Sequence, residues 1–399
     1  MAGKVPRNAG NQITPQASWG QSQVKSHLEV LDGLRGTAAL SVLLFHITEI
    51  TSPDIAHNPL RHAHLAVDFF FALSGFVLGY AYDARLSDSA APASRLTLKA
   101  FYLRRLIRLH PMVLVSMVVG LLGYVFDPYV SSGQAIGVKV SAGLLLLVFA
   151  LNLLLLPAPI LPNRFGETHS INPPSWTLFQ EYLANVVYGL VGSRLSNRAL
   201  GVVCAAGACA LLLTALHFGN LSAGWAWASF WAAFVRLAYP FFAGLLLYRL
   251  NLRGRLPHAY LWLSSLLVAV FAAPSMGRWD GLFEALCVIF VFPVTIWLAA
   301  GVSQINGLSG RLSRFTGSLS YPLYIIHYPA IYVFAHWYWR TKPSTSQLWL
   351  VSASLYFGVV LVAWLLLKHY DEPLRAWLTR KTASWPDERL TTRTEPARG

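Results

Sequence analysis

The chain has 399 residues, of which 55% are hydrophobic and only 12% are charged. Soluble domains carry about 25% charged residues, so this composition excludes an ordinary globular domain and predicts a polytopic membrane protein. The net charge of +14 does not indicate a nucleic-acid partner, because the basic residues stand in short loops between apolar runs, where they orient membrane spans. Cys204, Cys209 and Cys287 lie in apolar runs without paired spacing, which predicts neither disulfides nor a metal site.

Polar tails flank an apolar core. Residues 1–27 lack the pattern of a cleavable signal peptide, so we expect a disordered cytoplasmic tail there and a second one at residues 379–399. Residues 28–378 then form a single membrane domain. The apolar segments of this domain are Leu34–Ile50, His64–Tyr82, Leu106–Phe126, Val140–Pro157, Pro174–Gly192, Leu200–Phe218, Trp231–Tyr248, Ala259–Ala273, Leu282–Ala300, Leu319–Trp339 and Leu348–Leu367.

Basic loops predict the orientation of these segments. The loop at residues 83–108 contains six Lys or Arg residues against two Asp residues, so we expect it to face the cytoplasm together with both termini. The loops at 194–198, 249–255 and 311–314 are basic too. Three apolar segments lie between the loop at 83–108 and the loop at 194–198. Because three is an odd number, one of these segments should not cross the membrane.

The segment Pro174–Gly192 is the weakest candidate for a span, because Trp176, Gln180, Glu181 and Asn185 interrupt its apolar pattern. Non-crossing backbone at membrane depth is tolerated where protein or a water-filled cavity surrounds it. We therefore predict an all-α polytopic membrane protein. It should have about ten transmembrane helices and one re-entrant or cavity-lining segment around Glu181.

The first apolar segment, LRGTAALSVLLFHITEI, has Arg35 at its head and His46 well inside it. Each costs roughly 2.5–3.5 kcal/mol inside a span on insertion scales, which makes this segment a candidate functional site. The two residues are eleven positions apart, so they lie within ~20° of the same helix face and ~16 Å apart along the axis. We expect a cation near one membrane surface and a titratable imidazole deeper in, both lining one cavity.

Further ionisable residues stand inside or at the ends of other segments, namely Asp68, Glu181, Arg236, Glu284 and His327. Taken singly, each is explained by a salt bridge, an interhelical hydrogen bond or snorkelling to the surface. Taken together, they can line a polar cavity. His46 close to Asp68 or Glu181 would be a general base oriented by a carboxylate, which is the arrangement that acyl transfer needs.

Two more motifs are unusually polar. FYLRRLIRLHPM puts Arg105 and Arg108 on neighbouring turns of one helix, either as a positive-inside anchor or as a clamp for the phosphates of an anionic cofactor. GSLSYPLYIIHYPAIY, at residues 317–332, either hydrogen-bonds to neighbouring helices or lines the cavity. The candidate cavity-lining residues are Ser74, Trp176, Arg236, Tyr321 and His327.

From Leu31 to about Arg375 the chain resembles the membrane acyltransferase-3 family, the integral-membrane O-acyltransferases of cell-surface polysaccharides. Any one of the shared motifs is weak, but six in the same order are specific. They are LDGLRGTAALSVLLFH, VDFFFALSGFVL, RRLIRLHP, PPSWTLFQE, GSLSYPLYIIHYP and DEPLR. Thr177 stands where the family usually has Ser, and Tyr182 where many members have a second acidic residue. No family role is therefore carried over to those two positions.

The resemblance implies an acyl-CoA donor, such as acetyl-CoA, on the cytoplasmic side of a bacterial inner membrane. It implies a carbohydrate or lipid-linked sugar acceptor, such as an exopolysaccharide or lipopolysaccharide sugar. By resemblance, His46 is the base and Arg35 its companion, which also contacts the donor. Arg105 and Arg108 match positions that engage the donor, and Asp68 and Glu181 match the acidic positions of the catalytic site.

Two choices stay open at this stage. The acyl group could pass directly to the acceptor, or through a covalent intermediate on a Ser or Tyr of the segment that contains His327. A secondary transporter or acyl-group exporter would also bury Asp, Glu, His and Arg residues. The absence of an evident inverted repeat and the cytoplasmic Arg pair argue against a transporter. A sensor or structural protein would leave Arg35 and His46 unexplained.

Overall fold

A computed structural model describes residues 28–86, 95–130, 140–302 and 305–383. In these ranges the only extended pairing is an isolated bridge between Glu167 and Ala226. The α-helices are α1 (Glu29–Thr51), α2 (Ala66–Leu86), α3 (Leu98–Val125), α4 (Ala142–Leu153), α5 (Ser175–Leu190), α6 (Asn197–Phe218), α7 (Phe230–Arg249), α8 (Ala259–Phe271), α9 (Asp280–Leu286), α10 (Phe292–Ala300), α11 (Gly307–Thr341), α12 (Thr345–Leu366) and α13 (Glu372–Ala383).

Short helical turns join several of these helices. Two of them are π-helical and make their neighbours continuous: Cys287–Val291 links α9 to α10, and Leu367–Asp371 links α12 to α13. The 3₁₀ turns are Ile55–His57, Ala63–Leu65, Gly192–Arg194, Trp227–Ser229 and Gly277–Trp279. Each predicted apolar segment coincides with a helix, and Leu282–Ala300 coincides with the continuous α9–α10 pair.

Seven helical stretches in the described part of the chain are long and apolar enough to cross a membrane. They are Glu29–Thr51, Ala63–Leu86, Leu98–Val125, Asn197–Phe218, Trp227–Arg249, Gly277–Ala300 and Thr345–Thr382. α4 and α8 are shorter apolar helices, and α11 is long but rich in polar residues. The predicted class, an all-α polytopic membrane protein, is therefore confirmed. The number of crossings and the orientation of the termini stay predictions.

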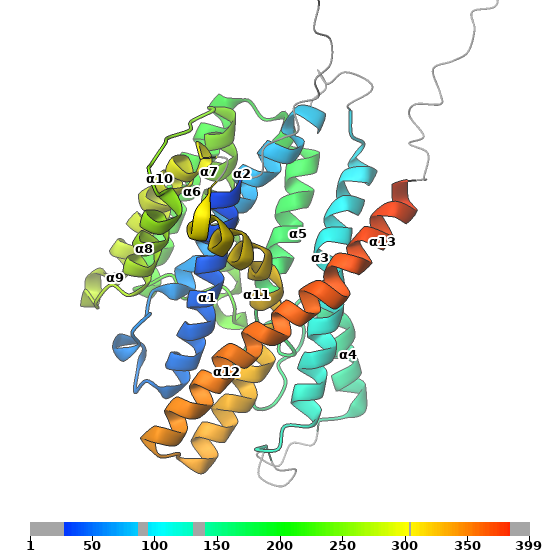
Figure 1. Ribbon diagram of the computed structural model, residues 1–399, viewed down its shortest axis with the longest axis vertical. Coiled ribbons are helices and arrows are strands. Elements are labelled where there is room, and N and C mark those ends of the chain that lie inside the picture. The colour runs from blue at the N-terminus through cyan, green and yellow to red at the C-terminus, as the bar shows by residue number, and fades with distance from the viewer. Residues whose placement is uncertain (1–27, 87–94, 131–139, 303–304, 384–399) are drawn as a thin grey trace, which may run out of the picture.

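α1, α2 and α11 occupy the middle of the bundle (Figure 1). α6 to α10 lie on one side of them and α3 to α5 on the other. Small residues allow the central helices to approach closely: a Cβ atom on Gly36 of α1 would lie 2.3 Å from the backbone carbon of Thr316 of α11. In the same way, a Cβ on Gly75 of α2 would lie 1.9 Å from the carbonyl oxygen of Phe241 of α7.

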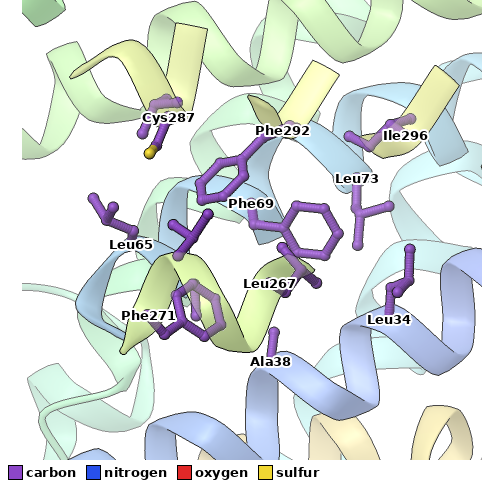
Figure 2. Close-up of a cluster of buried hydrophobic side chains, with 14 of the residues drawn as sticks. Leu34, Ala38, Leu65, Phe69, Leu73, Leu267, Phe271, Cys287, Phe292 and Ile296 are labelled. Carbon is purple, nitrogen blue, oxygen red and sulfur yellow. The ribbon is translucent and has the colours of Figure 1, made fainter. Parts of the chain in front are cut away.

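A hydrophobic cluster fills the space between α1, α2, α8 and α10 (Figure 2). Phe69 of α2 is fully buried there, and its ring meets that of Phe292 edge-on at 5.4 Å. Leu34 of α1 and Leu267 of α8 pack into the same cluster. This apolar contact holds α1 and α2 together, and these two helices contain the candidate site residues Arg35, His46 and Asp68.

The stretch between α4 and α5, residues 154–174, is irregular yet largely buried. Its backbone groups find internal partners: Ala158 N–H donates to Thr168 O at 2.8 Å, and Ile171 N–H donates to the side chain of Asn152 at 3.2 Å. Buried backbone must be satisfied in this way where no water is available. Glu181, around which we predict a re-entrant or cavity-lining segment, stands in the regular helix α5, and the irregular backbone precedes it. Glu181 does line the cavity described below.

The predicted tails fall mostly outside the described residues. Residues 1–27 and 384–399 are not described. The C-terminal boundary needs a correction, because α13 continues to Ala383 and residues 379–383 are therefore helical.

Candidate active site

A cavity of about 670 Å³ opens between α1, α2, α3, α5, α11 and the C-terminal residues 367–375. We call it the arginine cavity, because Arg35, Arg105, Arg108, Arg314 and Arg375 line it. Its acidic lining residues are Glu29, Asp32, Glu181, Asp371 and Glu372. Of the predicted cavity-lining residues, Ser74 and Tyr321 lie in this lining, whereas Trp176, Arg236 and His327 do not.

Arg108 differs from the other four arginines of the cavity. Those four each pair with a carboxylate: Arg35 with Asp32, Arg105 with Glu181, Arg314 with Glu29, and Arg375 with Asp371. Arg108 is exposed and has no hydrogen bond or ion pair to any described residue. Its guanidinium group is therefore available to an anion that enters the cavity.

Arg105 and Glu181 form a tight pair on the cavity wall. Arg105 Nη2 donates to Glu181 Oε1 at 2.5 Å, and Ser74 Oγ donates to the same oxygen at 3.5 Å. The Arg105 side chain is 8% exposed, so it is held in a narrow range of positions. α2, α3 and α5 thus each contribute one polar group to this wall. Glu181 orients Arg105, and it does not reach His46.

Arg35 ties α1 to α11 at the cavity edge. Its Nε donates to Ser320 Oγ at 2.8 Å, and its Nη2 donates to Gly317 O at 3.3 Å and contacts Asp32 Oδ1 at 3.1 Å. These bonds satisfy a guanidinium group that would otherwise be costly among apolar helices. Its position in the lining agrees with the predicted cation near one end of the first span.

Two tyrosines of α11 border the cavity. The Tyr321 hydroxyl donates to Leu109 O. The Tyr324 hydroxyl shares a hydrogen bond of 3.0 Å with Thr177 Oγ1 of α5, and both residues line the cavity. The Tyr324 ring lies 6.0 Å from the ring of His327, which is buried and outside the lining.

His46 lies outside the arginine cavity and is not part of its lining. Its Nδ1 is 2.9 Å from Glu49 Oε2, and its ring stacks on His327 at 5.4 Å and meets Tyr328 edge-on at 4.9 Å. The side chain of His46 is 20% exposed. The expectation that Arg35 and His46 line one cavity is therefore wrong: they share α1, but Tyr324 and His327 stand between the cavity and His46.

The carboxylate beside His46 is also not one of the two that we expected. Asp68 is fully buried against Arg236, whose Nη2 lies 2.5 Å from Asp68 Oδ2 and whose Nε lies 3.2 Å from Oδ1. Glu181 is bound by Arg105. The carboxylate that binds His46 is Glu49. We did not predict it from the sequence, although the i, i+3 spacing from His46 puts both side chains on one helix face.

Arg236 and Trp176 belong to a buried structural network. Arg236 Nη1 donates to Ala223 O at 2.7 Å and Nη2 donates to His64 O at 3.2 Å, so the guanidinium bridges three segments. The Trp176 ring lies 5.5 Å from its Cζ atom. A neighbouring carboxylate, Glu284, contacts His62 Nδ1 at 2.7 Å and His64 Nε2 at 3.1 Å. Glu284 was among the ionisable residues singled out from the sequence, whereas these two histidines were not.

The irregular stretch before α5 packs against α11 on the side of His46. Glu167 accepts a hydrogen bond of 2.6 Å from the Tyr332 hydroxyl, and Arg164 lies 3.7 Å from the centre of the Tyr332 ring. Nearby, His169 is enclosed, with Nε2 donating to Leu155 O at 2.9 Å. Burial lowers the pKa of His169 to about 4, so this residue is neutral near pH 7.

A family model described as an acyltransferase domain matches residues 28–368. The chain belongs to the acyltransferase-3 family. It is also similar to a protein of Rhizobium radiobacter called protein 2 in picA locus, with 32% identity over 193 residues, covering 47% of this chain and 95% of that protein. No solved structure matches the chain. The family and the apolar helices together identify a multi-pass membrane acyltransferase.

Proposed function

We propose that the protein transfers an acyl group, acetyl in the simplest case, from acyl-CoA to a hydroxyl group of a carbohydrate acceptor. The acceptor is an exopolysaccharide, lipopolysaccharide or lipid-linked sugar. The arginine cavity opens toward the cytoplasm of a bacterial inner membrane in this proposal, because Arg105 and Arg108 of its lining belong to the basic segment that predicts a cytoplasmic loop. Membership of the acyltransferase-3 family supports the reaction class.

The donor is bound through its phosphates by arginines of the cavity. Arg108 has no partner among the described residues and is free to bind a phosphate bidentately. Arg105 and Arg35 add positive charge along the wall, each held by hydrogen bonds. A volume of about 670 Å³ is within the range of small-molecule sites, roughly 300–1,000 Å³, and suits the pantetheine arm of CoA.

The acceptor is activated by His46. Its Nδ1–H donates to Glu49, which leaves a lone pair on Nε2 for the proton of a sugar hydroxyl group. Glu49 holds the tautomer and stabilises the imidazolium that forms. A positioned base of this kind contributes about 10²–10⁴-fold to the rate. The oxygen then attacks the carbonyl carbon of the acyl group that CoA supplies.

One arrangement supports this function. Near its C-terminal end, α1 has an imidazole bound to a carboxylate, His46 with Glu49. Near its N-terminal end, α1 lines the cavity that also contains the unpaired Arg108. The free arginine suits a polyanionic donor, and the histidine pair suits proton removal from an acceptor. An acyl-CoA and a sugar, supplied from opposite sides of a membrane, meet both requirements.

The test compares Arg108→Ala with Arg104→Ala in purified, detergent-solubilised protein. Arg104 is exposed on the same helix but does not line the cavity, so it controls for the loss of a surface charge. Losing one charge-assisted hydrogen-bonded contact costs about 1.5–3 kcal/mol, so Arg108→Ala should raise the Kd for acetyl-CoA about 10- to 150-fold. Equal affinities in the two variants, or no acetyl-CoA binding by the wild type, would contradict the donor assignment.

A further inference from the structure

His327 is a buried histidine whose two ring nitrogens are in very different surroundings. His327 is 1% exposed. Nδ1 lies 2.8 Å from Tyr324 O and 3.3 Å from Leu323 O. Carbonyl oxygens only accept hydrogen bonds, so Nδ1 carries the proton. Nε2 therefore holds a lone pair, and it has no hydrogen-bond partner among the described residues.

The surrounding helix holds this ring in place. α11 contains Pro322 and Pro329, and Pro329 lacks the N–H that would bond to Ile325 O four residues earlier. The side chain of Asn172 satisfies that carbonyl instead, at 2.7 Å. A buried nitrogen without a partner costs about 1–3 kcal/mol, so packing alone does not account for the bare Nε2 of His327. Its lone pair is not used by any hydrogen bond among the described residues, which is a requirement for a nucleophilic histidine.

The position of His327 connects the two halves of the site. On one side its ring lies 6.0 Å from that of Tyr324, which lines the end of the arginine cavity. On the other side it stacks on His46 at 5.4 Å, with only 21° between the ring planes. His327 is therefore in ring contact both with a residue of the cavity lining and with His46.

We propose that His327 carries the acyl group from the donor to the acceptor, a step that rests on the function proposed above. Rotation of Tyr324 away from Thr177 exposes Nε2 of His327 to the thioester. Nε2 attacks the carbonyl carbon, the C–S bond breaks, and CoA leaves as a thiolate among the cavity arginines. The product is an acylimidazolium that keeps its proton on Nδ1.

The second half of the reaction takes place at His46. Nε2 of His46 removes the proton from the acceptor hydroxyl group, whose oxygen attacks the acyl carbon on His327. The C–N bond breaks and His327 regains its lone pair. The thiolate takes a proton from water at the cavity mouth, and His46 returns its proton to water on its own side. Atoms and charge balance, and neither histidine is consumed.

This mechanism predicts a reaction that needs no acceptor. Wild-type protein given acetyl-CoA and radiolabelled CoA should move the label into acetyl-CoA, because the first half-reaction is reversible. His327→Asn keeps an N–H donor near the position of Nδ1 but has no nucleophile, so the exchange should be lost. His46→Ala should lose transfer to the acceptor, retain exchange, and accumulate an acetyl group on the peptide that contains His327, detected by mass spectrometry after rapid denaturation near neutral pH.

Each outcome decides the proposal. Exchange that persists in a folded His327→Asn protein, or an acetyl group on a Ser or Tyr instead, would overturn it. Absence of exchange in wild-type protein that binds acetyl-CoA would overturn the carrier role alone. Absence of both exchange and acetyl-CoA binding would overturn the proposed function and the carrier with it. If His327→Asn does not fold, the acetylated peptide in His46→Ala still decides the matter.

Discussion

The buried pair between Asp68 and Arg236 should serve stability and not chemistry. Arg236 is 1% exposed and makes two bonds to Asp68, one to Ala223 O and one to His64 O. Asp68→Asn leaves the two carbonyl contacts in place but removes the charge that neutralises the guanidinium. It also turns an amide N–H₂ group toward a cation that can only donate.

The magnitude follows from this geometry. Removing one partner of a buried ion pair costs about 3–5 kcal/mol, because the other charge stays buried and uncompensated. With the scaling of soluble domains, that loss lowers the apparent Tm on the order of 10 °C. Replacing both partners by apolar residues, as in Asp68→Leu with Arg236→Met, removes both charges together and should recover most of the loss.

The assay is thermal unfolding in detergent, measured alongside acetyl-CoA turnover for each variant. We expect Asp68→Asn to be unstable, and the double variant to be close to wild type in Tm and in activity per folded protein. A double variant that is stable but inactive would refute this reasoning and restore a catalytic role for Asp68 or Arg236. An unchanged Tm in Asp68→Asn would refute the energetic account itself.

Three further changes test the site and its frame. Glu49→Gln should lower turnover about 10²-fold while the protein stays folded, because the imidazolium loses its counter-charge; unaltered turnover would exclude Glu49 as the orienting group. Thr177→Val breaks the hydroxyl pair at the cavity end, worth about 0.5–1.5 kcal/mol, and should speed label exchange about 2- to 10-fold; slower exchange would argue against a barrier there. Gly36→Leu should abolish the monodisperse peak in size-exclusion chromatography, whereas Gly358→Leu, whose Cβ meets nothing within 4 Å, should not; two equal profiles would contradict the close α1–α11 contact.

Much of the fold was predictable because hydrophobic runs report directly on helices in a membrane. Even the short α8 and the continuous α9–α10 pair coincide with predicted segments. Spacing along one helix was informative too: Arg105 and Arg108 do line the same cavity. A period of 3.6 residues fixes which side chains share a face, and that relation survives folding.

Relations between helices could not be obtained in this way. Asp68 forms an ion pair with Arg236, which is 168 positions away along the chain. Nothing in either local sequence indicates that pairing. Sharing a face was also not enough to put Arg35 and His46 in one cavity, because α11 inserts Tyr324 and His327 between them. By contrast, Glu49 was within reach of sequence reasoning, since it follows His46 by three positions.

The irregular stretch before α5 illustrates a third limit. Its hydrogen bonds run to α4, to the loop at Trp225 and to α11, so its shape depends on three separate segments. The odd number of apolar segments predicted a non-crossing segment in this region, which stays a prediction. It did not indicate that the irregular backbone precedes Glu181, with that residue inside a regular helix.

The most direct test of the central claim is turnover of labelled acetyl-CoA by purified wild-type protein beside His46→Ala, with envelope polysaccharide as acceptor. If His46 is the base that activates the acceptor, label should appear in polysaccharide only with the wild type, and the variant should still bind acetyl-CoA. Label transferred at the wild-type rate by a folded His46→Ala protein would contradict the account.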